Sequence, residues 1–309
     1  MLLSEVISGL EGVLVRDGSF NRLDYCTVME NGPFLSFMER EKFLDSLLNN
    51  YCISCVICKP DLVDLMPDHI EGIFVSDEPK AAFEMIHNNL AYTPEYSLPN
   101  HDTLIGNNCS ISPLAYISEK NVKIGNNVII EPFVFIGEHV EIGDNCKIYN
   151  HATIGGRSFS YARVGEQDVT GLIDCGKVVL EDGVEIMSYS HLARGILPTD
   201  ITQVGKNSIL DAQVHIGHGA KLKERVFVAA HALVGGNTVI GRDSWVGVGA
   251  TISNRITIGT RCRVSIGSVV TKDVQDGMTV TGNFAVDHKR FISELKEKNA
   301  YYENKDIIE

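Results

Sequence analysis

Two histidines three positions apart, His215 and His218, are side chains of this sequence that could carry acid–base or metal chemistry. An imidazole with an unperturbed pKa of ~6.5 can accept a proton at neutral pH, and it is also a common zinc ligand. The pair therefore leaves two kinds of site open, a general base and a metal centre. The residues around them decide between the two.

Cys52, Cys55 and Cys58 are spaced like the ligands of a metal site. A second cysteine or histidine pair at matching spacing is missing, and the run Cys-Ile-Ser-Cys-Val-Ile-Cys is typical of a strand. In a strand, Cys55 points to the opposite face from Cys52 and Cys58. We therefore interpret the three residues as buried, inert thiols rather than as a zinc site.

The composition narrows the class of protein. The chain has 309 residues, with 27 Lys and Arg against 40 Asp and Glu, a formal net charge of −13. Such an acidic surface disfavours nucleic acids and anionic membranes as partners. No apolar run is long enough to span a bilayer, and no export signal is visible at the start. We expect a cytoplasmic protein of about two domains, with its eight cysteines reduced.

A six-residue period of aliphatic residues begins at residue 105. It continues with one extra residue before 124, and it pauses at Gly156–Lys177 and again at Ala193–Gln203. The anchors are Ile105, Ile111, Ile117, Ile124, Ile130, Ile136, Ile142, Ile148, Ile154, Leu180, Ile186, Leu192, Val204, Leu210, Ile216, Leu222, Val228, Val234, Ile240, Val246, Ile252, Ile258, Val264 and Val270. Small or β-branched residues often lie two positions before an anchor, as in a strand face, and glycine often follows it. Short strands joined by corners predict a parallel β-helix with eighteen residues per triangular coil.

The flanking segments predict an N-terminal α/β domain and a C-terminal helix. Helical spacing covers 44–48 and 80–90, strand patterns cover 54–58 and 71–75, and residues 93–103 are typical of a linker. An amphipathic helix over 287–298 is expected to close the solenoid. We predict three parts, residues 1–98, 99–283 and 284–309. Both interruptions of the period are expected to form loops on one face of the solenoid, where ligands often bind.

Four patterns carry a resemblance to a known family. They are Phe34-Leu35-Ser36-Phe37-Met38 with Phe43, the loop 156–162 ending Phe159-Ser160-Tyr161-Ala162, Leu210-Asp211-Ala212-Gln213 with Ile216-Gly217-His218, and the hexads. Over residues 30–283 the chain resembles the UDP-3-O-acylglucosamine N-acyltransferases of lipid A biosynthesis and their nucleotide-sugar relatives. The resemblance implies a left-handed β-helix, although the general crossover rule would favour a right-handed one. It also implies homotrimers with active sites between subunits.

The resemblance assigns roles to particular residues. His218 corresponds to the general base, Asp211 to the acid that orients it, and Gly236 to the glycine whose N–H stabilises the oxyanion. The spacing agrees, because Gly236 follows His218 by one coil and so stacks on it at about 4.8 Å. Phe37 and Phe43 correspond to a nucleobase clamp. Phe159, Tyr161 and His215 are further candidates for substrate binding.

The chemistry implied is transfer of an acyl group from coenzyme A or acyl carrier protein to the amine of a nucleotide-linked sugar, without a resident metal or redox cofactor. A local basic patch could receive either anionic carrier, with Arg255, Arg261, Arg263 and Lys272 as candidates. The chain departs from the family at Gly219, where the family has Asn, at Arg255, where it has His, and at Ser158 and Ser160, where it has Gly. With these departures, a short acyl group on a nucleotide-linked amino sugar for a surface polysaccharide or lipopolysaccharide fits at least as well as the lipid A substrate.

Four alternatives stay open from the sequence. The chain could be the lipid A N-acyltransferase proper, or an O-acyltransferase, since a histidine base serves a hydroxyl equally well. It could be a zinc enzyme of the carbonic anhydrase type, which uses the same solenoid, with His215 and His218 as ligands. It could also be a non-catalytic scaffold, in which case replacing His218 would change nothing.

Overall fold

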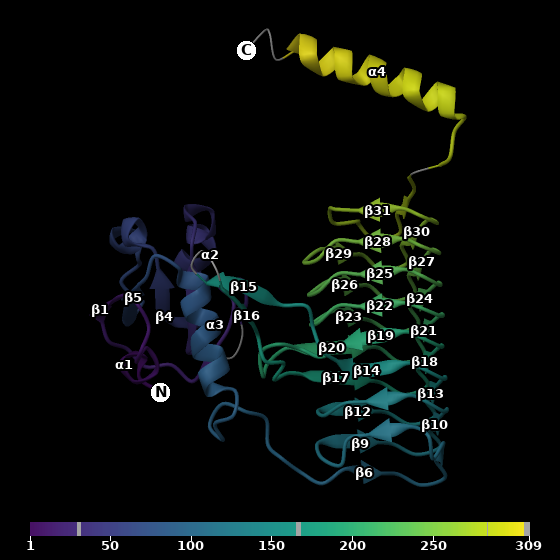
Figure 1. The fold of residues 1–309 in the computed structure, drawn as a ribbon, viewed down its shortest axis with the longest axis horizontal. Coiled ribbons are helices and arrows are strands. Elements are labelled where there is room, and N and C mark those ends of the chain that lie inside the picture. The colour runs from purple at the N-terminus through teal and green to yellow at the C-terminus, as the bar shows by residue number, and fades with distance from the viewer. Residues whose placement is uncertain (30–31, 165–167, 283, 306–309) are drawn as a thin grey trace.

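Figure 1 shows the computed structural model of the chain, which describes residues 1–29, 32–164, 168–282 and 284–305. A small N-terminal α/β unit stands beside a prism of stacked coils, and the C-terminal helix projects from the end of the prism. The fold is mostly β, with a left-handed parallel β-helix as its main body. The predicted boundary at residue 283 and the tail 306–309 lie outside the described residues.

Three parallel sheets form the sides of the prism in the described ranges. Sheet 1 consists of β7 Ser110–Ile111, β10 Ile129–Ile130, β13 Lys147–Ile148, β18 Glu185–Ile186, β21 Ile209–Leu210, β24 Phe227–Val228, β27 Trp245–Val246, β30 Arg263–Val264 and β32 Thr279–Val280. Sheet 2 consists of β8 Tyr116–Ile117, β11 Phe135–Ile136, β14 Thr153–Gly156, β19 His191–Ala193, β22 His215–Ile216, β25 Leu233–Val234, β28 Thr251–Ile252 and β31 Val269–Val270. Sheet 3 consists of β6 Leu104–Ile105, β9 Val122–Ile124, β12 Val140–Ile142, β17 Lys177–Leu180, β20 Ile201–Val204, β23 Lys221–Leu222, β26 Val239–Ile240 and β29 Thr257–Ile258.

The predicted anchors fill the prism. From Ile124 to Val270 every anchor is at most 7% exposed, and together they form one hydrophobic cluster. Each pairs with the anchor one coil away, as Ile216 does with Val234. Ile105 is 51% exposed because its coil is the first and has a neighbour on one side only. The six-residue period therefore predicted the core correctly.

The corners turn differently from the prediction. The sequence suggests that the glycine after an anchor turns the corner, but most left-handed φ angles occur two positions later, at asparagine in several coils, as at Asn127 (56°) and Asn237 (57°). Asparagine is among the few L-residues that adopt this conformation readily. Glycine after the anchor serves close packing instead, since a β-carbon on Gly125 would lie 2.8 Å from the carbonyl carbon of Gly143 in the next coil.

The N-terminal unit is built on a sheet with the order β1-β5-β4-β3-β2. Its elements are α1 Leu3–Val6, β1 Val13–Arg16, β2 Arg22–Leu23, β3 Phe34–Met38, η1 Glu41–Phe43, α2 Leu44–Leu48, β4 Ile53–Cys58, η2 Pro60–Leu65, β5 Gly72–Val75 and α3 Pro79–Leu90. The predicted helices and strands are confirmed to within a residue or two. Cys55 and Cys58 belong to hydrophobic clusters on opposite faces of β4, and burial raises the pKa of each thiol to about 11. These two thiols are therefore protonated at neutral pH.

Both interruptions of the period leave the prism at the edge between sheets 2 and 3, and both pack against the N-terminal unit. The first contains the hairpin of β15 Tyr161–Val164 and β16 Asp168–Gly171. Leu172, Ile196 and Leu197 from the two insertions join the hydrophobic cluster of the N-terminal sheet. The His87 ring on α3 lies 2.7 Å from the Ile173 carbonyl. The N-terminal unit is thus held at one edge of the prism.

The C-terminal helix α4, His288–Lys305, begins where the sequence predicts and runs further. Asp287 caps it by accepting hydrogen bonds from the amides of Lys289 (3.0 Å) and Arg290 (3.2 Å). The expected closing role is wrong, because the helix extends away from the prism and Phe291 and Leu295 are 51% and 42% exposed.

Candidate active site

His218 stands at a corner between β22 and β23, on the edge of the prism that carries both insertions. We call this edge, with His218, Gly236, Arg255 and the two insertions, the insertion edge. The ring is half-buried, and its Nδ1 is buried without a hydrogen-bond partner among the described residues. Burial, with a smaller contribution from the Arg255 cation, lowers the pKa of His218 to about 4. The imidazole is therefore neutral at pH 7 and able to accept a proton.

Gly236 lies directly against this ring, one coil further along. The Asn237 amide donates to the His218 carbonyl at 2.8 Å, which fixes the two coils in register. A β-carbon on Gly236 would stand 2.8 Å from His218 Nε2, so glycine is required for the ring to lie where it does. The Gly236 N–H donates no hydrogen bond to any described residue. The structure thus brings together a neutral imidazole nitrogen and a free backbone donor.

Asp211 does not contact His218 within one chain, and its role in orienting the ring stays a prediction. It follows β21 and therefore stands at the preceding corner of the same coil. Its carboxylate accepts hydrogen bonds from the amides of Ala212 (2.7 Å) and Ala230 (3.1 Å). The physical reason is that a residue after a sheet 1 strand and one after a sheet 2 strand occupy different edges of the prism.

His215 lies on the outer face of sheet 2, where it pairs with His191 of the previous coil. The two rings stack with centroids 5.2 Å apart, and their Nδ1 atoms are 3.4 Å apart. Burial lowers the pKa of both histidines, and for His191 the neighbouring His215 adds to the effect. His215 is thus outward-facing, as predicted, with another imidazole as its neighbour.

The N-terminal unit contributes a contact that the sequence did not indicate. The Arg255 guanidinium lies over the Tyr25 ring, 5.2 Å from its centroid. Nearby, Thr199 of the second insertion donates to Asp24 at 3.2 Å. Asp200 is buried beside them, and that burial raises its pKa to about 6. No local pattern could have found this contact, because it joins residues from opposite ends of the chain.

The predicted nucleobase clamp is not formed as a pair of facing rings. Phe37 packs against the cluster that contains Phe83, with ring centroids 5.0 Å apart, and it also contacts Tyr25. Phe43 packs against the separate cluster that contains Met38 and Leu47. The two side chains are partly buried and pack against different clusters of the N-terminal unit, and their role in substrate binding stays a prediction.

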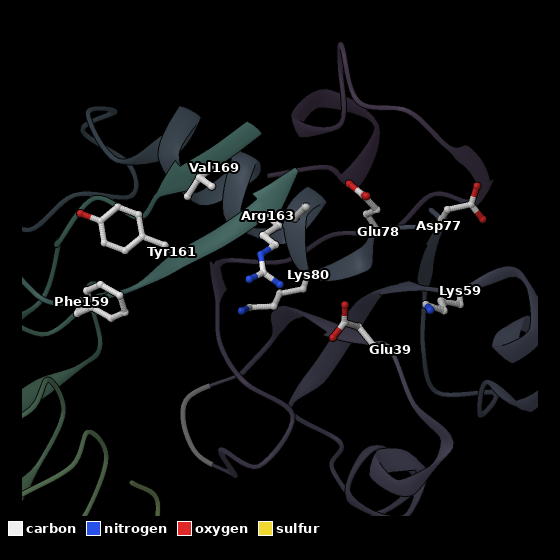
Figure 2. A pocket seen from close by; sticks show the side chains of 10 residues that line it. Glu39, Lys59, Asp77, Glu78, Lys80, Phe159, Tyr161, Arg163 and Val169 are labelled. Carbon is white, nitrogen blue, oxygen red and sulfur yellow. The ribbon is translucent and has the colours of Figure 1, made fainter. Parts of the chain in front are cut away.

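Phe159 and Tyr161 instead line a pocket between the hairpin and the N-terminal sheet (Figure 2). The pocket has a volume of about 740 Å³ and includes residues that follow β3, β4 and β5. The Phe159 and Tyr161 rings lie 5.2 Å apart, and Phe159 is 91% exposed. The lining includes three cations and three carboxylates: Lys59, Lys80, Arg163, Glu39, Asp77 and Glu78. Aromatic faces beside cations could bind a ligand with a ring and an anionic group.

Two further observations concern metals and membranes. No group of three or more His, Cys, Asp or Glu side chains among the described residues could hold a metal ion. None of the helices in the described part of the chain is long and apolar enough to cross a membrane.

Comparisons with known proteins find relatives in sequence and in structure. Residues 121–156 match the family model "Bacterial transferase hexapeptide (six repeats)". The chain is 44% identical over 153 residues to a UDP-3-O-acylglucosamine N-acyltransferase of Caulobacter vibrioides, covering 50% of this chain and 44% of the relative. A protein of the same name from Agrobacterium fabrum is 33% identical over 81 residues, covering 26% and 22%. The chain thus matches less than half the length of these curated relatives.

Solved structures support the fold. The UDP-N-acetylglucosamine acyltransferase from Campylobacter jejuni superposes with a TM-score of 0.51 at 24% identity, covering 59% of this chain and 68% of that one. The enzyme of that name from Bacteroides fragilis gives 0.52 at 23% identity, covering 60% and 69%. The resemblance found in the sequence is therefore confirmed at the level of the hexapeptide repeat and of the relatives' names.

Proposed function

We propose that the chain is an N-acyltransferase that moves an acyl group from a thioester carrier to the amine of a nucleotide-linked sugar. The observation that carries the proposal is the close approach of the His218 ring to the Gly236 backbone on the insertion edge. A β-carbon on Gly236 would lie 2.8 Å from His218 Nε2. The relatives that match the chain are named for N-acyl transfer to a UDP-linked acylglucosamine, which supports this reaction class.

The mechanism uses both groups. The amine nitrogen attacks the thioester carbon while His218 Nε2 accepts its proton, a contribution typically worth ~10²–10⁴-fold in rate. The Gly236 N–H donates to the carbonyl oxygen as negative charge gathers there, which is worth about 3 kcal/mol. The C–S bond then breaks, and the proton on His218 passes to the leaving thiolate. The products are an amide and a free thiol.

The pocket lined by Phe159 and Tyr161 supports a nucleotide-bearing substrate. Figure 2 shows Lys80 and Arg163 side by side, with the two aromatic rings on the hairpin side of the pocket. Cations suit the phosphates, and an exposed ring suits stacking on a base. We propose that this pocket, rather than a clamp of Phe37 and Phe43, receives the nucleotide. From the resemblance to the N-acyltransferase family we also propose that coenzyme A or acyl carrier protein is the carrier, and that the protein assembles as a trimer.

The test is direct. Purified protein is incubated with a panel of nucleotide-linked amino sugars and with short acyl-coenzyme A or acyl carrier protein. Free thiol and product mass are then measured. We expect one acceptor to gain the acyl mass as a linkage that resists hydroxylamine, and the His218→Gln variant to lose the transfer. A hydroxylamine-labile product would mean O-acylation. No transfer to any acceptor, or transfer that is indifferent to His218→Gln, would reject the proposal.

A further inference from the structure

Arg255 occupies an unusual position at the insertion edge. It lies at a corner one coil beyond Gly236, and its amide donates to the Gly236 carbonyl at 2.9 Å. Its backbone is left-handed, with φ of 60°, the conformation that Asn237 adopts at the same corner one coil earlier. A bulky cationic residue thus stands at the corner where the preceding coil has asparagine. The arginine side chain is not needed for the turn.

The guanidinium is oriented by an aromatic ring and not by a carboxylate. It lies 5.2 Å from the Tyr25 centroid, and among the described residues it forms no ion pair. Contact with an aromatic face holds the cation without occupying the N–H donors, which lie in the plane of the guanidinium group. Tyr25 is itself held between Phe37 and Phe83. The cation is thus positioned with its donors unused.

The neighbouring acids already have partners. Asp24 pairs with Arg22 at 3.1 Å, and Glu84 pairs with Lys80 at 3.6 Å. Asp200 accepts hydrogen bonds from two backbone amides of its own loop, each at 3.3 Å. None of these three carboxylates pairs with Arg255, although all lie close enough to Tyr25 to act on its hydroxyl. The guanidinium therefore remains available to an anionic group from outside the chain.

We propose that Arg255 is a binding residue for a phosphate group of the substrate, so that the acyl acceptor is a sugar whose anomeric phosphate lies close to the reacting amine. This inference rests on the proposed function. The coils of His218 and Arg255 are two rises of about 4.8 Å apart, a separation that a hexose ring can bridge. A guanidinium binds phosphate oxygens through two parallel N–H donors, which fixes orientation as well as position. Arg255 then aligns the amine with His218.

A conservative variant isolates the charge. Arg255→Asn keeps the corner conformation that asparagine adopts at 237, and Arg242→Asn is its control. Arg242 is likewise an exposed arginine at a corner, but it lies on the edge between sheets 3 and 1, away from the N-terminal unit. Circular dichroism melts of both variants are expected to match the parent chain.

The test measures binding and kinetics separately. Inorganic pyrophosphate is titrated calorimetrically into the parent protein and both variants. We expect Arg255→Asn to weaken binding tenfold to a hundredfold, as for a charge-assisted hydrogen bond, and Arg242→Asn to change it less than twofold. With the active acceptor, Arg255→Asn should raise KM for the nucleotide sugar and leave KM for the thioester unchanged. Equal effects of the two variants on pyrophosphate binding would overturn the proposal.

The two proposals fail separately. Acyl transfer that proceeds with an unchanged acceptor KM in Arg255→Asn would reject the phosphate contact and leave the proposed function standing. Pyrophosphate binding that depends on Arg255, in a protein that transfers no acyl group, would support the phosphate contact and reject the proposed function.

Discussion

Gly236 packs against His218 so closely that a β-carbon on the glycine would lie 2.8 Å from the imidazole Nε2. Gly236→Ala should therefore displace the ring and lower turnover about a hundredfold, since small misplacements of a reacting group have effects of that size. Steady-state kinetics on the active acceptor check this. Gly282→Ala, where a β-carbon would meet open space, is the control and should retain full activity.

Replacing His218 with Gln should lower turnover a hundredfold or more while the fold survives. The pKa of His218 is about 4 because burial and Arg255 disfavour the imidazolium. The acid limb of the parent enzyme's kcat/KM profile should therefore fall near pH 4, well below the value for an unperturbed histidine. His231→Asn, at an exposed left-handed corner, is the control. An acid limb at pH 6 or above would contradict this account of the ring.

Asp211→Asn separates two roles for that carboxylate. Because its oxygens accept from the Ala212 and Ala230 amides, the change should cost about 1 kcal/mol in the free energy of unfolding. Turnover should change less than tenfold, and the acid limb should stay in place. Urea titration and kinetics measure the two effects. A large loss of turnover without loss of stability would restore Asp211 as the group that orients His218.

The six-residue period of aliphatic residues predicted most of the fold. Each strand of the prism must place one aliphatic side chain in the hydrophobic core that runs through all the coils. The arrangement of side chains around His218 was only half predictable. Gly236 followed from the coil length, whereas Arg255 and Tyr25 meet through the packing of the N-terminal unit, which no spacing encodes. Sequence proximity does not say which edge of a prism, or which face of a sheet, a side chain occupies. It therefore did not indicate that Asp211 and His218 lie at different corners, or that Phe37 and Phe43 pack against different clusters.

His139 should make the protein sensitive to acid. Burial, followed by the nearby Arg194 and Lys177 cations, lowers its pKa to about 4. Between pH 6.5 and 4 the unfolded chain binds a proton that the folded chain does not, so stability falls as pH falls through that window. His139→Asn removes this linkage and suits the left-handed corner at φ 57°. The unfolding midpoint of this variant should decline less between pH 6.5 and 4 than that of the parent protein. An equal decline in both proteins would contradict a role of His139 in the acid sensitivity.

Arg163 tests the pocket beneath the hairpin. Arg163→Gln removes one of the three lining cations, and we expect it to weaken nucleotide binding severalfold to tenfold. Thermal shift with a nucleoside diphosphate reports the change, because ligand binding raises the melting temperature by mass action. Arg242→Gln, on an exposed corner of the prism, should leave the shift unaltered. An equal shift in both variants would place the nucleotide elsewhere.

The insertions that supply Leu172, Ile196 and Leu197 to the N-terminal sheet have a consequence for how the chain unfolds. The hydrophobic core of the N-terminal unit is incomplete without the apolar side chains of the two insertions, which are connected to coils of the prism. Heating should therefore unfold the N-terminal unit and the prism together in a single calorimetric transition. A fragment that ends at residue 98 should expose apolar surface and aggregate.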